Sequence, residues 1–272
     1  MYNKMEIKKN LHNVAHWWPV NLFLRGINLL YLRFFYHPIH RKKYKVLSRY
    51  KDCHKGKRCF IVATGPSLQL EDINKLKGEI CFGMNSIFKL YDKTEWRPTY
   101  YAIIDSSVYR RIKNDIEQID IEGLFFPDRI LDSALVNAHY VPFIDNWCNS
   151  AIERRVIPNI FQKRKFGRDM TKRFYAGASV VHFIMQIAFY MGFSEIYLLG
   201  TDCSAPNKHS TLTPYKDSDQ LGNSPQDIYD GLMQDYEIAK QEAIKRGIKI
   251  INATRGGALE LFPRVDLDDL LG

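Results

Sequence analysis

Short apolar runs alternate with amphipathic stretches along most of the chain. The runs are rich in Ile, Val, Phe and Tyr and are bounded by Gly, Pro, Asn or Asp, which is typical of strands buried on both faces of a parallel sheet. The strands predicted in this way span residues 59–63, 80–84, 100–104, 124–126, 140–142, 195–200 and 248–251. Helices are predicted between them over residues 71–76, 108–116, 179–191 and 225–246.

This alternation predicts an α/β protein with a Rossmann-like, doubly wound and mostly parallel sheet. Ligands of such sheets bind beyond the carboxyl ends of the strands, so the polar residues that follow the predicted strands are the candidate site. These residues are Thr64 to Ser67, Asn85, Asp105, Thr201 to His209 and Asn252 to Gly257. We assign the catalytic domain to residues 46–272 and a separate arm to residues 1–45.

The arm combines an apolar, aromatic stretch with a basic cluster. Residues 16–36 are rich in Trp, Phe and Leu, and residues 41–45 contain four Lys or Arg side chains. Asn21, Arg25 and Asn28 fall on one helical stripe, which disfavours a spanning helix and favours an amphipathic helix lying in an anionic membrane interface. The alternative is that the arm packs on the domain or on a second subunit, so a homo-oligomer stays open.

The net charge of +9 is concentrated at the N-terminal end of the chain. Residues 1–58 contain 14 Lys or Arg and two acidic residues, a net charge of +12, which leaves −3 for residues 59–272. Because the apolar, aromatic stretch precedes the basic cluster, we expect the arm to bind a membrane surface and not nucleic acid. Five scattered cysteines without a C-x-x-C pair disfavour a disulfide framework and a zinc site. A cytoplasmic protein, peripheral at the inner face of the cell membrane, is the resulting prediction.

The turn after the first predicted strand carries the candidate phosphate site. Thr64, Gly65, Pro66 and Ser67 lie between this strand and a helix, where free backbone N–H groups and the helix dipole attract phosphate. Ser67 adds a hydroxyl. The turn lacks the Gly-Lys-Ser/Thr of a P-loop and is not a G-x-G-x-x-G fingerprint.

Three stretches of the chain resemble known families. The string FIVATGPSL at residues 60–68, followed by Asn85 after the second strand, is similar to the opening of the CMP-sialic-acid-dependent lipooligosaccharide sialyltransferases. Residues 177–179 and 192–202 are similar to a later turn, helix and strand end of those enzymes. Together with residues 251–258, these stretches more closely resemble a broader family. It contains the archaeal-type 6-hydroxymethylpterin diphosphokinases and the motility-associated flagellin glycosylation factors, and the resemblance covers residues 55–272.

The resemblance implies a nucleotide site and assigns residues to it. The implied nucleotide-binding residues are Thr64, Gly65, Pro66, Ser67, Asn85, Asp105, Arg173, Gly177, Ser179, Thr201, Tyr215 and Asn252. His209 is the implied general base, because an imidazole titrates near neutral pH, and Asp202 is the second catalytic residue. Two positions depart from the sialyltransferase pattern, since Ala63 replaces a Gly and Asp105 replaces an Asn.

Three functions follow as hypotheses. The first is a bacterial glycosyltransferase of polysaccharide biosynthesis, which moves a sugar such as a nonulosonic (sialic) acid from its CMP ester to a surface glycan or lipid-linked acceptor. It requires no cofactor, although Asp105 leaves the use of Mg²⁺ open. The second is an Mg²⁺-dependent diphosphokinase of the pterin type, with Asp105 and Asp202 as metal ligands. The third is a nonenzymatic, nucleotide-binding membrane scaffold.

Overall fold

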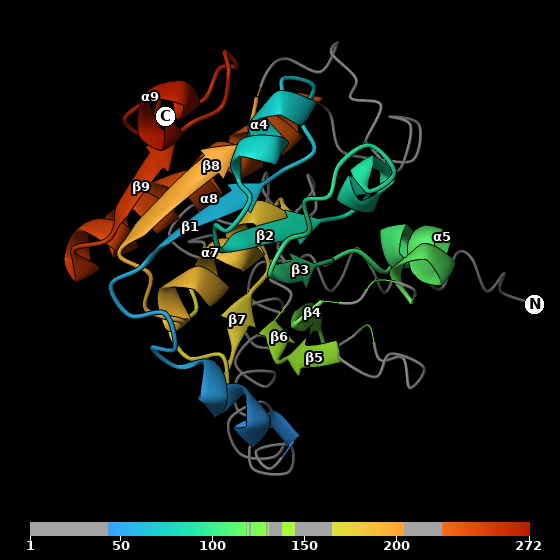
Figure 1. Ribbon diagram of the computed structural model, residues 1–272. Helices are drawn as coiled ribbons and strands as arrows, with labels where there is room; N and C mark the ends of the chain where they lie inside the picture. Colours follow the sequence, from blue (N-terminus) through green and yellow to red (C-terminus); the bar gives the residue numbers. More distant parts are fainter. Residues whose placement is uncertain are drawn as a thin grey trace, which may run out of the picture.

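A seven-stranded parallel sheet with helices on both faces forms the centre of the computed structural model (Figure 1). The structure describes residues 43–117, 119, 121–128, 130, 138–144, 165–203 and 225–272, so the arm up to residue 42 lies outside the described residues. The strand order is β5-β4-β3-β2-β1-β8-β9, and every neighbouring pair is parallel. This arrangement confirms the predicted Rossmann-like, doubly wound fold.

The elements agree closely with the predicted ones. The strands of the main sheet are β1 (Arg58–Val62), β2 (Cys81–Met84), β3 (Tyr100–Ala102), β4 (Gly123–Pro127), β5 (Ala138–Val141), β8 (Glu195–Leu199) and β9 (Lys249–Asn252). The helices are η2 (Lys45–Tyr50), α4 (Leu70–Lys75), η3 (Ile87–Leu90), α5 (Ser106–Ile116), α7 (Val180–Tyr190), α8 (Pro225–Arg246) and α9 (Leu267–Leu271). The 3-10 helices η2 and η3 were not predicted.

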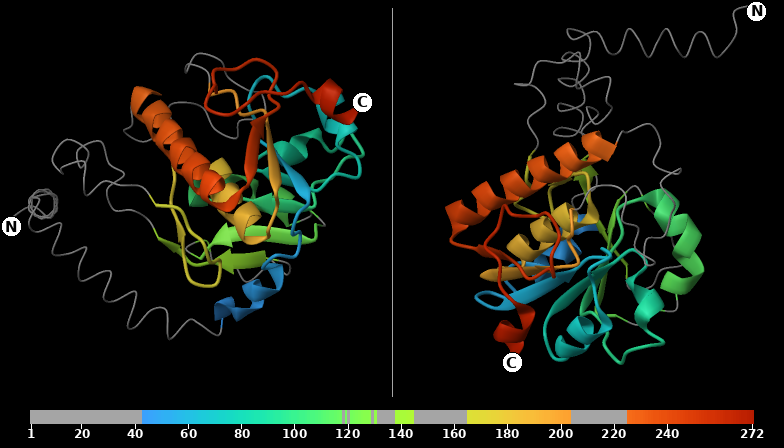
Figure 2. Two further views of the ribbon diagram at one scale, coloured as in Figure 1. Left: turned by 90° about the vertical axis from the view of Figure 1, so that its left-hand side faces the viewer. Right: turned by 90° about the horizontal axis from the view of Figure 1, so that it is seen from above.

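Alternate residues of each strand point into two apolar layers. In β1, Cys59 and Ile61 belong to the layer that contains η2, α7 and α8, whereas Phe60 and Val62 belong to the layer with α4, α5 and α9. Figure 2 shows the helices on the two sides of the sheet. Burial on both faces explains why the strand sequences are almost continuously apolar.

Helix α7 is buried along its whole length, because it packs against the main sheet, helix α8 and a second small sheet. This sheet pairs β6 (Phe143–Ile144) with β7 (Phe174–Tyr175) and was not predicted. Gln186 joins β7 and the preceding loop to the helix. Its side-chain oxygen accepts from the N–H of Gly167 (2.7 Å) and of Tyr175 (3.0 Å), and its side-chain nitrogen donates to the Tyr175 carbonyl (3.0 Å).

The segment around η2 belongs to the folded domain. Tyr44 is 1% exposed, and its hydroxyl donates to Asp128 Oδ2 at 2.7 Å. His139 Nε2 lies 2.7 Å from the Tyr50 hydroxyl and 2.8 Å from Arg49 Nη2. Burial, with a contribution from the Arg49 charge, lowers the pKa of His139 to about 4, so the ring is neutral and accepts hydrogen bonds at physiological pH. Tyr44, which sequence analysis places in the arm, therefore packs on the domain.

We predict that Gln186→Leu destabilises the fold by about 2–4 kcal/mol, since it leaves two buried N–H groups without an acceptor. Gln241→Leu is the matched control, because Gln241 is exposed on α8 and bonds only to Glu237; it should change stability by less than about 0.5 kcal/mol. Urea unfolding measures both values. Equal effects of the two substitutions would contradict the structural role of Gln186.

Candidate active site at the reversal of strand order

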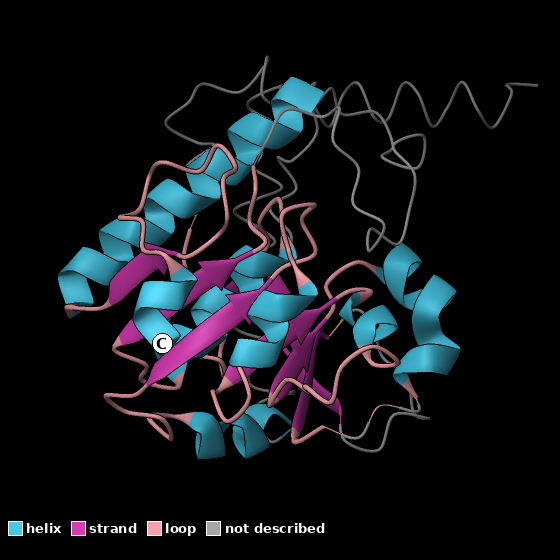
Figure 3. Cartoon of the chain, turned by 45° about the horizontal axis from the view of Figure 1, so that its top comes forward, coloured by secondary structure: helices cyan, strands magenta, loops and turns pink. Residues whose placement is uncertain are grey.

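The carboxyl ends of β1 and β8 lie side by side where the strand order of the sheet reverses. Chain connections run from β1 through β2 to β5 in one direction, and β8 and β9 lie on the other side of β1. In doubly wound sheets the ligand crevice forms at this point. Figure 3 shows the loops that leave the strands at this edge of the sheet. The Gly65 N–H donates to the Gly200 carbonyl at 2.9 Å and ties the two strand ends together.

Gly65 and Asp202 pack against each other without space for a side chain on Gly65. A Cβ atom at this position would lie 2.0 Å from Asp202 Oδ2 and 2.3 Å from the Gly200 carbonyl oxygen. Ser67 donates to the same carboxylate oxygen, from its hydroxyl at 2.8 Å and from its N–H at 3.4 Å. The Leu68 N–H donates to the Gly65 carbonyl. The N–H groups of Gly65 and Ser67, which we expected to be free for phosphate, are therefore used within the protein.

Thr64 and Asn85 retain polar groups that a ligand can use. They follow β1 and β2, which are neighbouring strands about 4.8 Å apart. Both residues are half-buried, and among the described residues neither Thr64 nor the Asn85 side chain has a hydrogen-bond partner. Asn85 adopts a φ of 49°, a left-handed conformation that Asn tolerates better than most residues, and its carbonyl accepts from the Tyr101 hydroxyl.

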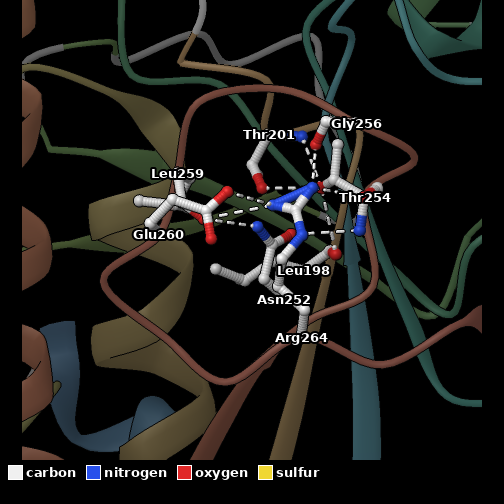
Figure 4. Close-up of polar contacts among 8 residues, drawn as sticks. All are labelled: Leu198, Thr201, Asn252, Thr254, Gly256, Leu259, Glu260 and Arg264. Atoms are coloured by element: carbon white, nitrogen blue, oxygen red, sulfur yellow. Dashed lines mark hydrogen bonds and ion pairs between the residues drawn. The ribbon is translucent and has the colours of Figure 1, made fainter.

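The loop after β9 forms one wall of the site and holds the end of β8. The Thr254 hydroxyl accepts from the Thr201 N–H at 3.1 Å, lies 3.0 Å from the Thr201 hydroxyl and donates to the Leu198 carbonyl at 3.3 Å (Figure 4). The Ala258 N–H donates to the Asp202 carbonyl at 2.6 Å. Gly257 lies against this carbonyl, since a Cβ there would come within 2.7 Å of its oxygen.

Asn252 and Arg264 fix the shape of this loop. The Asn252 side chain donates to the Leu259 carbonyl at 2.8 Å and accepts from the Thr254 N–H at 3.0 Å. The Arg264 guanidinium donates to the carbonyls of Leu259, Thr254 and Gly256 (Figure 4). Sequence analysis assigned Asn252 to nucleotide binding, whereas the structure gives its buried amide two partners within the loop.

Asp105 lies apart from Asp202. It caps α5, with its Oδ1 accepting from the Ser107 N–H and hydroxyl, both at 2.6 Å. The strands β3 and β8, which these two carboxylates follow, are separated by β2 and β1. At about 4.8 Å per strand the strand ends are roughly 14 Å apart, too far for both carboxylates to bind one Mg²⁺. No cluster of three or more metal-binding side chains occurs in the part of the chain that the structure describes.

Gly177 and Ser179, two further predicted nucleotide-binding residues, lie in the turn before α7. Ser179 caps α7 by accepting from the His182 N–H at 3.5 Å, and the N–H of Ala178, which follows Gly177, donates to Asp235. Asp235 is a buried carboxylate of α8 that sequence analysis missed. In the sequence, Asp235 adjoins Tyr236 on the apolar face of this helix, and an acidic residue at such a position indicates a buried carboxylate.

The remaining predicted residues are placed as follows. Arg173 precedes β7, and its Nη1 lies 3.4 Å from the Tyr175 hydroxyl. His209 and Tyr215 lie outside the described residues. Cys203 follows Asp202 at a φ of 46°, and burial raises the pKa of its thiol to about 11. The thiol is therefore protonated at neutral pH, which makes Cys203 a poor nucleophile.

Fold and site together define a doubly wound α/β protein with polar residues at the reversal of strand order. The model of the 6-hydroxymethylpterin diphosphokinase MptE-like family matches residues 35–208, which is more than half of the chain. The chain therefore belongs to the 6-hydroxymethylpterin diphosphokinase MptE-like family. No curated protein shows significant sequence similarity to it. Within the ranges that the structure describes, no helix has the length and apolar character needed to cross a bilayer.

Two solved structures are similar in fold. One is the MAf glycosyltransferase from Magnetospirillum magneticum AMB-1, with a TM-score of 0.47 and 14% identity over 84% of this chain. This chain spans only 38% of the length of that protein. The other is the sialyltransferase CstII from Campylobacter jejuni, solved with the substrate analogue cytidine-5'-monophosphate. Its TM-score is 0.45, with 16% identity over 78% of this chain and 85% of that chain.

We predict that the Thr254 hydroxyl stabilises the end of β8. Thr254→Val keeps the shape but leaves the buried Thr201 N–H and the Leu198 carbonyl without this partner, and should cost about 2–4 kcal/mol. Thr254→Ser keeps the hydroxyl and loses one methyl group, which should cost about 1 kcal/mol. Chemical denaturation of both variants checks the difference. If Ser is as costly as Val, packing of the methyl group and not the hydrogen bonds holds the loop.

Proposed function

We propose that this protein is a nucleotide-dependent glycosyltransferase whose donor binds in the crevice between β1, β2 and β8. The observation that carries the proposal is the arrangement of Thr64, Asn85 and Asp202 on three consecutive strands of the sheet. Thr64 and Asn85 supply hydrogen-bonding groups that are unused among the described residues, next to the point at which doubly wound sheets bind nucleotides.

The charge of Asp202 supports a particular class of donor. This carboxylate is 9% exposed, and no Lys or Arg among the described residues contacts it. A CMP ester of a nonulosonic acid carries one negative charge on its phosphodiester and one on its sugar carboxylate, whereas a nucleoside triphosphate carries more, all of them on its phosphates. Repulsion by the partly buried carboxylate is therefore weaker for the CMP ester than for the triphosphate, and this supports a nucleotide-sugar donor that binds without a metal ion.

The acceptor side of the proposal rests on the sequence. His209 would deprotonate the acceptor hydroxyl, and Tyr215 and Arg173 would contact the donor phosphate or an anionic acceptor. The amphipathic arm would hold the protein at the cytoplasmic face of the membrane, where lipid-linked and surface-glycan acceptors are assembled. A soluble small-molecule acceptor would not require such an arm.

A second candidate function is an Mg²⁺-dependent diphosphokinase, which membership of the MptE-like family favours. In that case ATP would bind in the same crevice, and Mg²⁺ would neutralise its phosphates. Asp202, the substrate phosphates and water would have to supply the ligands, since Asp105 ends a strand roughly 14 Å away. A nonenzymatic scaffold is the third function, which binding without turnover would support.

We predict that the combined variant Thr64→Val and Asn85→Gly loses about 2–5 kcal/mol of nucleotide-binding free energy, because two hydrogen bonds to a charged ligand disappear. Gly preserves the left-handed backbone at position 85. Asp52→Gly is the control, since Asp52 has a similar φ of 55° near the opposite end of β1. Thermal shift with CMP, UDP, GDP and ATP, each with and without Mg²⁺, measures binding in all three proteins.

The outcomes of this screen separate the candidate functions. Stabilisation by CMP without Mg²⁺, lost in the double variant and retained in Asp52→Gly, supports the transferase. Stabilisation by ATP only in the presence of Mg²⁺ supports the diphosphokinase. Unchanged affinity in the double variant would place the nucleotide elsewhere.

We predict that His209→Ala lowers kcat by about 10²–10⁴ with little change in donor affinity, because a general base acts on the transition state. The rate of the parent enzyme should fall at acid pH as the imidazole becomes protonated. Ser210→Ala is the neighbouring control and should retain activity. Transferase assays over a pH series measure these effects. Full activity of His209→Ala, together with inactivation by a chelator, would reject this mechanism and support the kinase.

A further inference from the structure

A basic segment, the strip, leads into the amino end of β1, whereas the candidate site lies at the carboxyl end of this strand. Residues 43–58, which form η2 and lead into β1, contain seven Lys or Arg side chains and one Asp, a net charge of +6. The rest of the domain, residues 59–272, has a net charge of −3. Residues 151–173 also carry a net charge of +6, so the strip, which leads into the amino end of β1, is one of two strongly basic segments.

Backbone hydrogen bonds fix residues 52–56 of the strip at the amino ends of the strands. The N–H groups of Asp52, His54 and Gly56 donate to the carbonyls of residues 190–192 in the turn that leads from α7 into β8. The Lys249 N–H, at the start of β9, donates to the Ser194 carbonyl in the same turn. Residues 52–56 therefore lie at the ends of β1 and β8 that are farthest from Gly65 and Asp202, whereas Tyr44, just before η2, contacts Asp128 after β4.

Four lysines of the strip carry charges without a compensating acid. Lys45, Lys51, Lys55 and Lys57 are exposed, and none has an ion-pair partner among the described residues. Within the strip Arg58 is paired with Glu79, and elsewhere on the domain cations such as Lys249 and Arg255 are paired with carboxylates. A cluster of unpaired lysines repels itself, and an anionic partner relieves this repulsion.

Exposed apolar side chains accompany the lysines. Of the described residues, only Val46 and Ile244 are large hydrophobics with high exposure, at 51% and 71%. Val46 lies in η2 between the lysines. Ile244 is in the last turn of α8, just before β9, and so lies at the same edge of the sheet. Basic and apolar groups together fit the headgroup region of an anionic bilayer better than they fit nucleic acid, which rewards charge alone.

We propose that the amino-end edge of the sheet, centred on residues 45–57, docks on an anionic phospholipid surface. The strip continues the apolar and basic arm of residues 16–43 in the sequence, so both would meet the same leaflet. This inference deepens the membrane placement proposed above and is independent of the identity of the donor. It orients the protein with the β1–β8 crevice pointing away from the bilayer, toward the aqueous side.

The test compares two charge-reversal variants of the full chain that have the same net charge. Lys51→Glu with Lys55→Glu alters the strip, and Lys89→Glu with Arg110→Glu alters exposed positions on η3 and α5. Cosedimentation is measured with phosphatidylcholine vesicles, with and without phosphatidylglycerol, at low and at physiological ionic strength. Each Lys or Arg near an anionic surface strengthens binding by about fivefold. We expect the strip variant to lose at least about tenfold in partitioning to the anionic vesicles, and the control to lose less than about twofold.

Three results would overturn the inference. They are equal losses in the two variants, no loss in the strip variant, and binding of the parent chain to single-stranded nucleic acid but not to anionic vesicles. Circular dichroism confirms that both variants are folded. Thermal shift with the nucleotide identified for the parent protein separates this inference from the proposed function. A strip variant that loses vesicle binding but keeps nucleotide binding would support the docking surface and leave the proposed function unaffected.

Discussion

The contact between the turn after β1 and the end of β8 sets the geometry of the candidate site. The Asp202 carboxylate and the Gly200 carbonyl occupy the space that a Cβ atom on Gly65 would need. The two strand ends therefore lie in close contact. Ser67 then donates twice to the same carboxylate. Because these groups satisfy one another, the crevice presents Thr64 and Asn85 to a ligand and not the amides of the turn.

The loop after β9 keeps the end of β8 in position. The Thr254 hydroxyl accepts from the Thr201 N–H and the Ala258 N–H donates to the Asp202 carbonyl. Asn252 and Arg264 fix the loop from within. A carboxylate held in this way loses little conformational entropy when a ligand binds. It also cannot move away from an added negative charge, which is why the charge of the donor matters in the proposed function.

Most of the fold could be predicted from the sequence, because burial on both faces gives β1, β2 and β8 continuous apolar runs. The pair β6 and β7 could not, since strands of two residues have no periodicity. In the site, the sequence analysis places Gly65, Ser67, Thr201 and Asp202 after predicted strands, and the structure brings these residues together at the ends of β1 and β8. The bonds among them could not be predicted, since Ser67 and Asp202 are 135 residues apart. For the same reason the internal roles of Asn252 and Asp235 were missed.

Because Ser67 and its partner Asp202 are 135 residues apart, a Gly-Pro-Ser motif in another chain does not by itself identify a complete site. The motif follows β1, but its partner Asp202 follows β8, which comes after β2 to β5 and α7 in the sequence. A truncated gene product or an alternative open reading frame that keeps only the first half of the sheet would contain the motif without its carboxylate. Such a fragment would have the signature but only half of the site, so the motif is diagnostic only when a Gly-x-Asp strand end follows it.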